Sequence, residues 1–128
     1  MDVISCAAVR KPTLIKTDGH EKQTYKTDTD REWMEKKVRY VMRCAALKGC
    51  RRLVLGAMGC GAYGNPIWEV ATIMKKVLCS NGSLNDCEDW SGVEEIVIAI
   101  WDQQPNKPVW NGFKDIFGQV KEVVVDAE

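Results

Sequence analysis

The chain has 128 residues, enough for a single domain with a modest hydrophobic core. Its 18 Lys and Arg residues balance 18 Asp and Glu residues, so its charge favours binding neither to nucleic acid nor to a membrane surface. No apolar run approaches the ~20 residues of a membrane-spanning helix, and no signal-peptide pattern opens the chain, so we expect a cytoplasmic or nuclear protein.

Six cysteines and one histidine, His20, bear on metal and redox chemistry. No two cysteines have the spacing Cys-x-x-Cys, so we expect no metal site and no cofactor. Because no secretion signal is present, we expect the thiols to be reduced. Most of them lie at apolar positions, where a thiol packs as a small hydrophobe.

The first part of the chain predicts a strand, a loop and a helix. Residues 2–9 are mostly apolar and favour a buried strand, whereas residues 13–28 are polar and favour a long loop. Asp28 or Asp30 can cap the helix that follows, and Gly49 is placed to end it. Along this helix the apolar residues recur at helical spacing, at Met34, Val38, Val41, Met42 and Ala45.

The second part alternates two strands with two helices. We expect strands over residues 53–58 and 93–101, and helices from Pro66 to about Leu78 and over residues 110–120. Residues 123–125 favour either a short final strand or a tail. The apolar face of the helix that starts at Pro66 consists of Val70, Ile73, Met74, Val77 and Leu78.

The resulting order, β-α-β-α-β-α, predicts one α/β domain over residues 1–128. Nearly continuous apolar strands that alternate with helices indicate a mostly parallel sheet of three or four strands, covered on both faces. In such sheets ligands bind at the carboxyl ends of the strands. A glycine-rich segment and the pair Trp101-Asp102 both follow strands at such ends.

The glycine-rich segment after the second strand predicts a phosphate-binding loop. Tyr63 lies among its four glycines, and Asn65 and Pro66 then suit the N-cap and first position of a helix. Loop amides and a helix N-terminus together favour an anion. The plain alternative is a tight strand-to-helix connection without a ligand. The glycines are Gly56, Gly59, Gly61 and Gly64.

Two common phosphate-loop motifs fit this segment poorly. No Lys-Ser or Lys-Thr follows its last glycine, which excludes a P-loop. A dinucleotide-binding motif would need an acidic residue after a second strand, but Glu69 comes too early and Asp86 lies in a polar loop. The dinucleotide-binding fold therefore stays only as an alternative.

Residues 55–66, Leu-Gly-Ala-Met-Gly-Cys-Gly-Ala-Tyr-Gly-Asn-Pro, resemble the signature loop of the microbial-type poly(ADP-ribose) glycohydrolases, a family of the macrodomain superfamily. Residues 2–9 are similar to the strand before the family's long helix, and residues 96–102 to its last core strand. Residues 111–117 are similar to the start of its closing helix. The resemblance implies a three-layer α/β/α macrodomain-like fold, of which this chain would hold the C-terminal part.

The resemblance also implies a site for ADP-ribose. In macrodomains the glycine loop surrounds the diphosphate of this ligand, and Tyr63 matches an aromatic residue that packs against the distal ribose. Asn65 ends the loop, where we expect it to act first as a helix cap. The backbone donors implied are those of Gly59, Cys60, Gly61, Ala62, Tyr63 and Gly64.

The family places the adenosine end of the ligand beyond its last core strand. Asp102 and Asn111 match positions there, and Phe113 is a candidate contact for the adenine. The alternative for Phe113, and more so for Phe117, is a helix face packed in the core.

The sequence departs from the family where catalysis is expected. The glycohydrolases carry an upstream segment in which several glycines precede Gln-Glu-Glu, and this sequence has neither a Gly-Gly pair nor a Gln-Glu dipeptide. We therefore expect a fragment or a truncated member without the family's catalytic acid. We expect Glu69 to point to solvent, and Cys60 lacks a histidine that would activate it as a nucleophile. The other candidate carboxylates are Asp18, Glu21 and Asp102.

Three functions remain open on this basis. The first is binding of ADP-ribose, or of an ADP-ribosylated protein, without turnover. The second is hydrolysis of an ADP-ribose linkage, as in a poly(ADP-ribose) glycohydrolase. The third is a degenerate remnant with a structural role in an oligomer. Because a shortened sheet would leave an uncovered edge, we also expect a homodimer through that edge.

Overall fold

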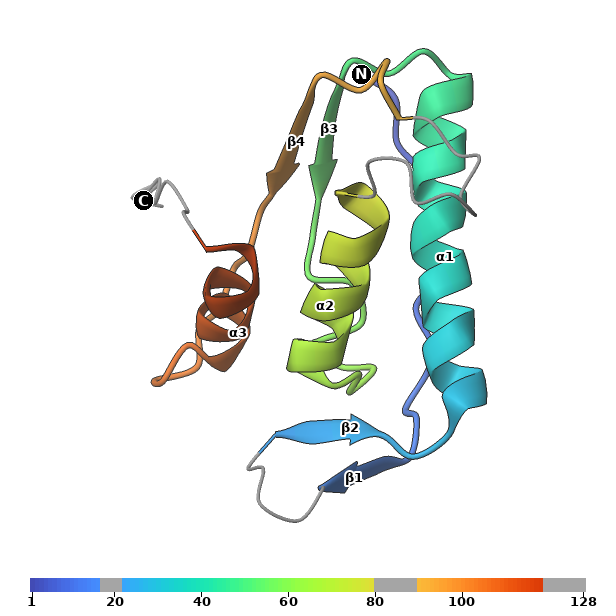
Figure 1. Cartoon of the computed structure of the whole chain (residues 1–128). Coiled ribbons are helices and arrows are strands. Elements are labelled where there is room, and N and C mark those ends of the chain that lie inside the picture. The colour runs from blue at the N-terminus through green and yellow to red at the C-terminus, as the bar shows by residue number, and fades with distance from the viewer. Residues whose placement is uncertain (17–21, 80–89, 119–128) are drawn as a thin grey trace.

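The structure, a computed structural model, describes residues 1–16, 22–79 and 90–118 (Figure 1). The final strand considered for residues 123–125 lies outside these ranges. No helix within them is long and apolar enough to cross a bilayer. The α/β class is confirmed by the order of elements, which is β1 (Leu14–Lys16), β2 (Gln23–Tyr25), α1 (Asp28–Leu47), β3 (Arg52–Leu55), α2 (Ile67–Leu78), β4 (Glu95–Ile98) and α3 (Pro108–Phe117).

β3 and β4 pair in parallel, as the alternation of strands and helices predicts. Two side chains of each strand pack against the hydrophobic core, and they alternate with Val54 and Val97, which are 68% and 45% exposed. Figure 1 shows α2 between α1 and α3, just beyond the carboxyl ends of β3 and β4. Among the described residues, one face of the sheet is covered by helices and the other exposes apolar side chains.

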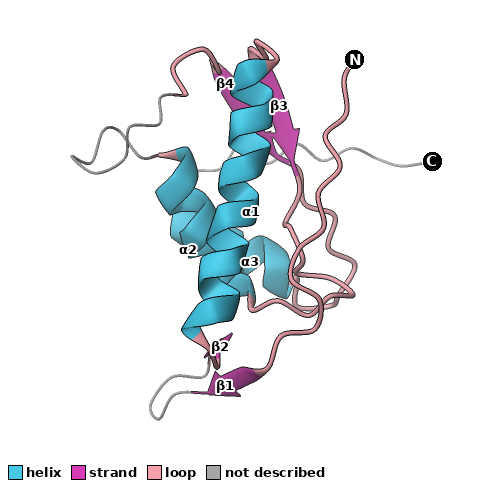
Figure 2. Cartoon of the chain, turned by 90° about the vertical axis from the view of Figure 1, so that its right-hand side faces the viewer, coloured by secondary structure: helices cyan, strands magenta, loops and turns pink. Residues whose placement is uncertain are grey.

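The strand expected over residues 2–9 is absent, and the described parallel sheet has two strands instead of three or four. Residues 2–9 run as an irregular segment (Figure 2), with Val3 81% exposed and Ala8 buried. A hollow of about 280 Å³ lies between this segment and β3, lined on its two sides by Ile4 and Val54 among others. An apolar segment becomes a strand only when its backbone pairs with a neighbour, and residues 2–9 pair with no described strand.

β1 and β2 form an antiparallel hairpin within residues 13–28, which were expected to be a loop. Each strand has only three residues, Leu-Ile-Lys and Gln-Thr-Tyr, which is too short to show an alternating pattern in the sequence. Tyr25 explains why they form: its side chain is only 2% exposed and belongs to the hydrophobic core. Burial of this one aromatic ring stabilises the position of the hairpin against the helices.

α1 supplies one of the two long apolar faces of the core. All five residues of its predicted face are buried, which confirms the helical spacing. Its N-cap is Thr27, whose hydroxyl accepts a hydrogen bond from the amide of Asp30 at 3.3 Å, so the expectation of a cap at Asp28 or Asp30 was wrong. After the helix Gly49 has a φ of +68°, the left-handed conformation that favours glycine at a helix end.

α2 packs between α1 and α3 and contributes Val70, Ile73, Met74 and Val77 to the core, as predicted. α3 approaches it closely at Gly112, where a Cβ atom would lie 2.6 Å from Cγ2 of Ile67. A glycine at this position therefore allows the two helices to touch.

Candidate functional site

The glycine loop leaves the carboxyl end of β3, beside the segment that follows β4. The amide of Ala99 donates to the carbonyl of Leu55 at 2.8 Å, which keeps the two chain segments together as the strands end. The loop thus lies at the end of the sheet where parallel α/β proteins bind ligands.

Two hollows flank the loop, and Gly61 lines both of them. The first hollow, of about 630 Å³, is formed by the loop at Ala57 and Cys60 and by residues 99–105 after β4. The second hollow, of about 440 Å³, is formed by the loop at residues 58–63 and by residues 5–8. An elongated ligand can therefore lie across Gly61 with one end in each hollow.

Hydrogen bonds within the loop decide which of its amides can receive a ligand. The amide of Cys60 donates to Ala57 at 3.2 Å and that of Gly64 to Gly61 at 3.0 Å. These two amides are occupied, contrary to the expectation that they bind ligand. Among the described residues, the amides of Gly59, Gly61, Ala62 and Tyr63 donate to no protein acceptor. The consecutive amides 61–63 are therefore the donors available at the junction of the hollows.

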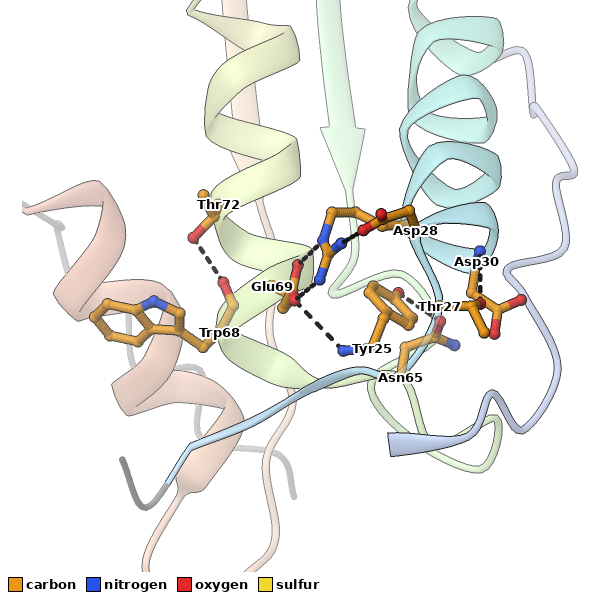
Figure 3. A network of polar contacts seen from close by, with 9 residues as sticks. Tyr25, Thr27, Asp28, Asp30, Asn65, Trp68, Glu69 and Thr72 are labelled. Atoms are coloured by element: carbon orange, nitrogen blue, oxygen red, sulfur yellow. Dashed lines mark hydrogen bonds and ion pairs between the residues drawn. The ribbon is translucent and has the colours of Figure 1, made fainter. Parts of the chain in front are cut away.

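Asn65 closes the loop from beneath. Its side chain is 3% exposed, and its amide nitrogen donates to the carbonyls of Val9 at 2.6 Å and Gly59 at 3.1 Å. Its amide oxygen accepts from the Tyr25 hydroxyl at 2.7 Å (Figure 3). Asn65 was expected to cap the helix, but the N-cap of α2 is Pro66, with no side-chain cap.

Burial keeps the Tyr25 hydroxyl protonated and able to donate. The pKa of Tyr25 is raised, first by burial and then by electrostatic repulsion between the tyrosinate and the ionised forms of Cys60 and Glu69. Sequence reasoning missed Tyr25, although a lone aromatic in the polar stretch 13–28 was a usable signal of burial.

Glu69 joins the hairpin to both long helices (Figure 3). Its carboxylate accepts from Nε of Arg31 at 2.9 Å, from Nη2 of Arg31 at 2.7 Å and from the amide of Tyr25 at 3.4 Å. The side chain is 13% exposed, so the expectation that it points to solvent was wrong. Arg31 also pairs with Asp28 on its own helix. These contacts make Glu69 a structural carboxylate.

The fold is similar to solved structures of microbial poly(ADP-ribose) glycohydrolase (PARG). A Deinococcus radiodurans mutant in complex with ADP-ribose matches 71% of this chain at 25% identity, with a TM-score of 0.62. A Thermomonospora curvata mutant matches 72% of it at 29% identity and a TM-score of 0.62. This chain has a microbial PARG-like fold.

The PARG-like region is a part of those proteins. The matches cover 34% and 33% of the two solved chains, so this chain spans about a third of their length. A second Thermomonospora curvata structure matches 67% of this chain at 33% identity and 31% of its own length, with a TM-score of 0.52. No family model and no curated protein sequence matches the chain.

Tyr63 and Cys60, two side chains of the glycine loop, differ in exposure and in reactivity. The Tyr63 ring is 38% exposed and lines the second hollow. The Cys60 thiol is half-buried, and burial raises its pKa to about 12. A catalytic thiol needs a lowered pKa, so the structure argues against Cys60 as a nucleophile.

Asp102 lines the first hollow, whereas Asn111 lines a separate hollow of about 710 Å³ beside Gly64, and both side chains bond within the protein. The Asp102 carboxylate accepts from the amides of Gln104 at 3.1 Å, Val109 at 2.8 Å and Trp110 at 3.3 Å. It thereby caps α3 from outside the helix. The Asn111 amide donates to the carbonyl of Asn106 at 2.8 Å. Both side chains therefore have partners within the protein, and their role in ligand binding stays a prediction.

Phe113 was a candidate contact for an adenine, and the structure corrects this. Its ring is 3% exposed and stacks on Phe117, with centroids 6.1 Å apart and planes 9° apart. The alternative reading of these residues as a core helix face is the right one for Phe113. The exposed aromatic residue beside the first hollow is Trp101, 73% exposed, which sequence reasoning did not select as a contact.

Two candidate carboxylates, Asp18 and Glu21, lie outside the described residues. Within the described ranges no group of three or more His, Cys, Asp or Glu side chains could hold a metal ion. The described site is therefore a set of backbone donors and two hollows without a cluster of titratable side chains.

Proposed function

We propose that this chain binds ADP-ribose, free or attached to a protein, through the loop that surrounds Gly61. The observation that carries the proposal is the set of unoccupied amides at residues 61–63, at the junction of two hollows. Three adjacent N–H groups suit a diphosphate, and the N-terminus of α2 begins a few residues later and adds a positive partial charge. The Deinococcus radiodurans structure with ADP-ribose supports the choice of ligand.

The two hollows assign the two ends of the ligand. In this proposal the adenosine lies in the first hollow, against Trp101, and the distal ribose lies in the second hollow, against Tyr63. Both rings are exposed, and ring faces of this kind stack on bases or pack on sugars. The diphosphate then lies over Gly61, and no described Lys or Arg lines either hollow.

Calorimetric titration with ADP-ribose tests the proposal. A Cβ at Gly61 would meet no atom within 4 Å, so Gly61→Glu fits the fold while it places a bulky anion where the diphosphate would lie. Gly92 is equally open, lies before β4 at the opposite end of the sheet, and makes Gly92→Glu a matched control. We expect wild-type protein and G92E to bind and G61E to lose at least about tenfold in affinity. Failure of the wild type to bind, or equal binding by G61E, would overturn the proposal.

Binding without turnover is the favoured form of this function. The two described carboxylates that the sequence offered for catalysis, Glu69 and Asp102, are both bonded to protein donors, whereas glycoside hydrolysis needs a carboxylate at the anomeric carbon. The PARG similarity keeps hydrolysis of an ADP-ribose linkage as the second candidate. Release of ADP-ribose from a modified protein by purified chain would establish that candidate instead.

We also propose that two copies associate through the open face and edge of the β3–β4 sheet. Val54 and Val97 project from that face and are both exposed, and β3 pairs on one side only among the described residues. Light scattering of the purified chain should show a dimer, and Val54→Lys should shift it to monomer. A wild-type monomer at high concentration would contradict the association.

A further inference from the structure

The Asn65 side chain ties together three chain segments that are distant in sequence. Its partners are Val9, before the hairpin, Tyr25, on β2, and Gly59, within the loop. The main chain of Asn65 adds a bond, because its amide donates to the Gly59 carbonyl at 2.9 Å. The loop is therefore closed at its base by two hydrogen bonds between the same two residues.

The partners dictate how the carboxamide is oriented. Two carbonyl oxygens face one end of it and can only accept, so this end must be the NH2 group. The remaining oxygen must then accept from Tyr25. Asparagine is the side chain of this size that supplies two donors at one end and an acceptor at the other.

Gly59 is shaped to fit this carboxamide. It has a φ of +74°, and a Cβ there would lie 2.5 Å from both Nδ2 of Asn65 and Cβ of Ala8. The turn at Gly59 and the side chain of Asn65 thus determine each other's positions. The free amides of residues 61–63 lie between these two anchors.

We propose that Asn65 is the positioning residue of the site: it holds amides 61–63 in the shape that receives the anion, without touching the ligand. This inference rests on the proposed function, because the anion is the ADP-ribose diphosphate. Asn65 is almost completely buried beneath the loop, so its effect on binding passes through Gly59.

The substitution Asn65→Asp gives this role a signature that general destabilisation does not share. The introduced group keeps the size of asparagine, but its ionised form presents an anion to the carbonyls of Val9 and Gly59. Burial beside two carbonyls raises the pKa of such a carboxyl group. Once protonated, it can donate to one carbonyl and still accept from Tyr25. Acidification should therefore restore the native loop conformation in N65D.

ADP-ribose affinity measured across pH is the test, with each variant expressed relative to wild type at the same pH. We expect N65D to bind about tenfold more weakly than wild type at pH ~8, and to recover at least about threefold of that loss near pH ~5. Gln23→Glu, an amide-to-acid change at an exposed position of β2, serves as control and should stay at the wild-type ratio throughout. A ratio for N65D that does not change with pH, or no loss at all, would overturn the positioning role.

Hydrogen exchange of the free protein separates this inference from the proposed function. Amides 59–65 should exchange faster in N65D than in wild type, and less so at acidic pH, whether or not ADP-ribose binds. If wild type binds no ADP-ribose but N65D loosens these amides, the ligand assignment fails and the loop-positioning role stands. If N65D does not fold, Tyr25→Phe carries the test: it removes one donor to Asn65, so we expect about two- to fivefold weaker binding at a ratio independent of pH. Wild-type affinity in Y25F would then overturn the role.

Discussion

The link between Glu69 and Arg31 is a sharp place to test how the helices and the hairpin hold each other. Glu69→Gln keeps the shape of the side chain but removes its charge and turns one acceptor into a donor. Two hydrogen bonds from Arg31, at 2.7 and 2.9 Å, and one from the Tyr25 amide, at 3.4 Å, depend on this carboxylate. The amide group of glutamine cannot accept both bonds from the guanidinium.

The expected cost follows from burial. Hydrogen bonds to charged groups contribute about 1.5–3 kcal/mol each when buried. The Glu69 side chain is 13% exposed but that of Arg31 is 35% exposed, so water screens the pair and regains part of the loss. We therefore expect E69Q to lose about 2 kcal/mol of unfolding free energy in total, which corresponds to roughly 6–10 °C in Tm for a domain of this size.

Thermal and urea denaturation of E69Q against wild type measure this effect. Asp28→Asn is the matched control, because Asp28 pairs with the same arginine but its side chain is 89% exposed. An exposed ion pair of this kind contributes little to stability, so D28N should have the same Tm as the wild type. If the Tm of E69Q equals that of the wild type, the Glu69 carboxylate does not stabilise the fold, and it becomes a candidate for catalysis again.

Three further predictions concern close packing and pH. Gly59→Ala should lower the unfolding free energy by more than about 2 kcal/mol in urea denaturation, because positive φ alone costs about 1–2 kcal/mol and the new Cβ would lie 2.5 Å from two side-chain atoms. Gly61→Ala, at an open position, should leave the unfolding free energy unchanged. Equal urea midpoints for the two variants would contradict the close packing at Gly59. Gly112→Ala should lower Tm, because its Cβ would lie 2.6 Å from a methyl group of Ile67, and an unchanged Tm would show that α3 can move away freely. Glu35 is buried enough to oppose ionisation, yet hydrogen bonds from a lysine and an arginine hold its pKa below the usual 4.5. Its contribution is therefore present above pH 4.5 and lost as pH falls through the lower folded value. Glu35→Gln should destabilise at pH ~7 and have a smaller effect at pH ~3, and equal loss at both values would refute the assignment.

The helices and the parallel strand pair were predictable because their signals are local. The buried face of α1 follows a spacing of three and four residues, and β3 and β4 are short apolar runs between turn residues. The glycine loop was also found, since strand, glycines and helix are contiguous in the sequence. Segments of this kind need little information from the rest of the chain.

Predictions failed where a residue's role depends on a distant partner. Residues 2–9 have the composition of a strand, but their backbone pairs with no described strand. Glu69 has a surface-like position in its helix, but Arg31 meets it from 38 residues away. Asp102 precedes a helix it was not expected to cap, and its carboxylate reaches the amides at 109 and 110.

The sequence by itself determined that a glycine loop joins a strand to a helix in an α/β chain, because hydrophobic spacing and glycine content are local properties. Only the tertiary structure decided which amides of the loop are free and what holds them. Cys60 and Gly64 use their amides within the loop, while Asn65 is drawn beneath it by Val9 and Tyr25. A buried polar group must be satisfied wherever partners lie in space, and their identity is set by packing between elements far apart along the chain.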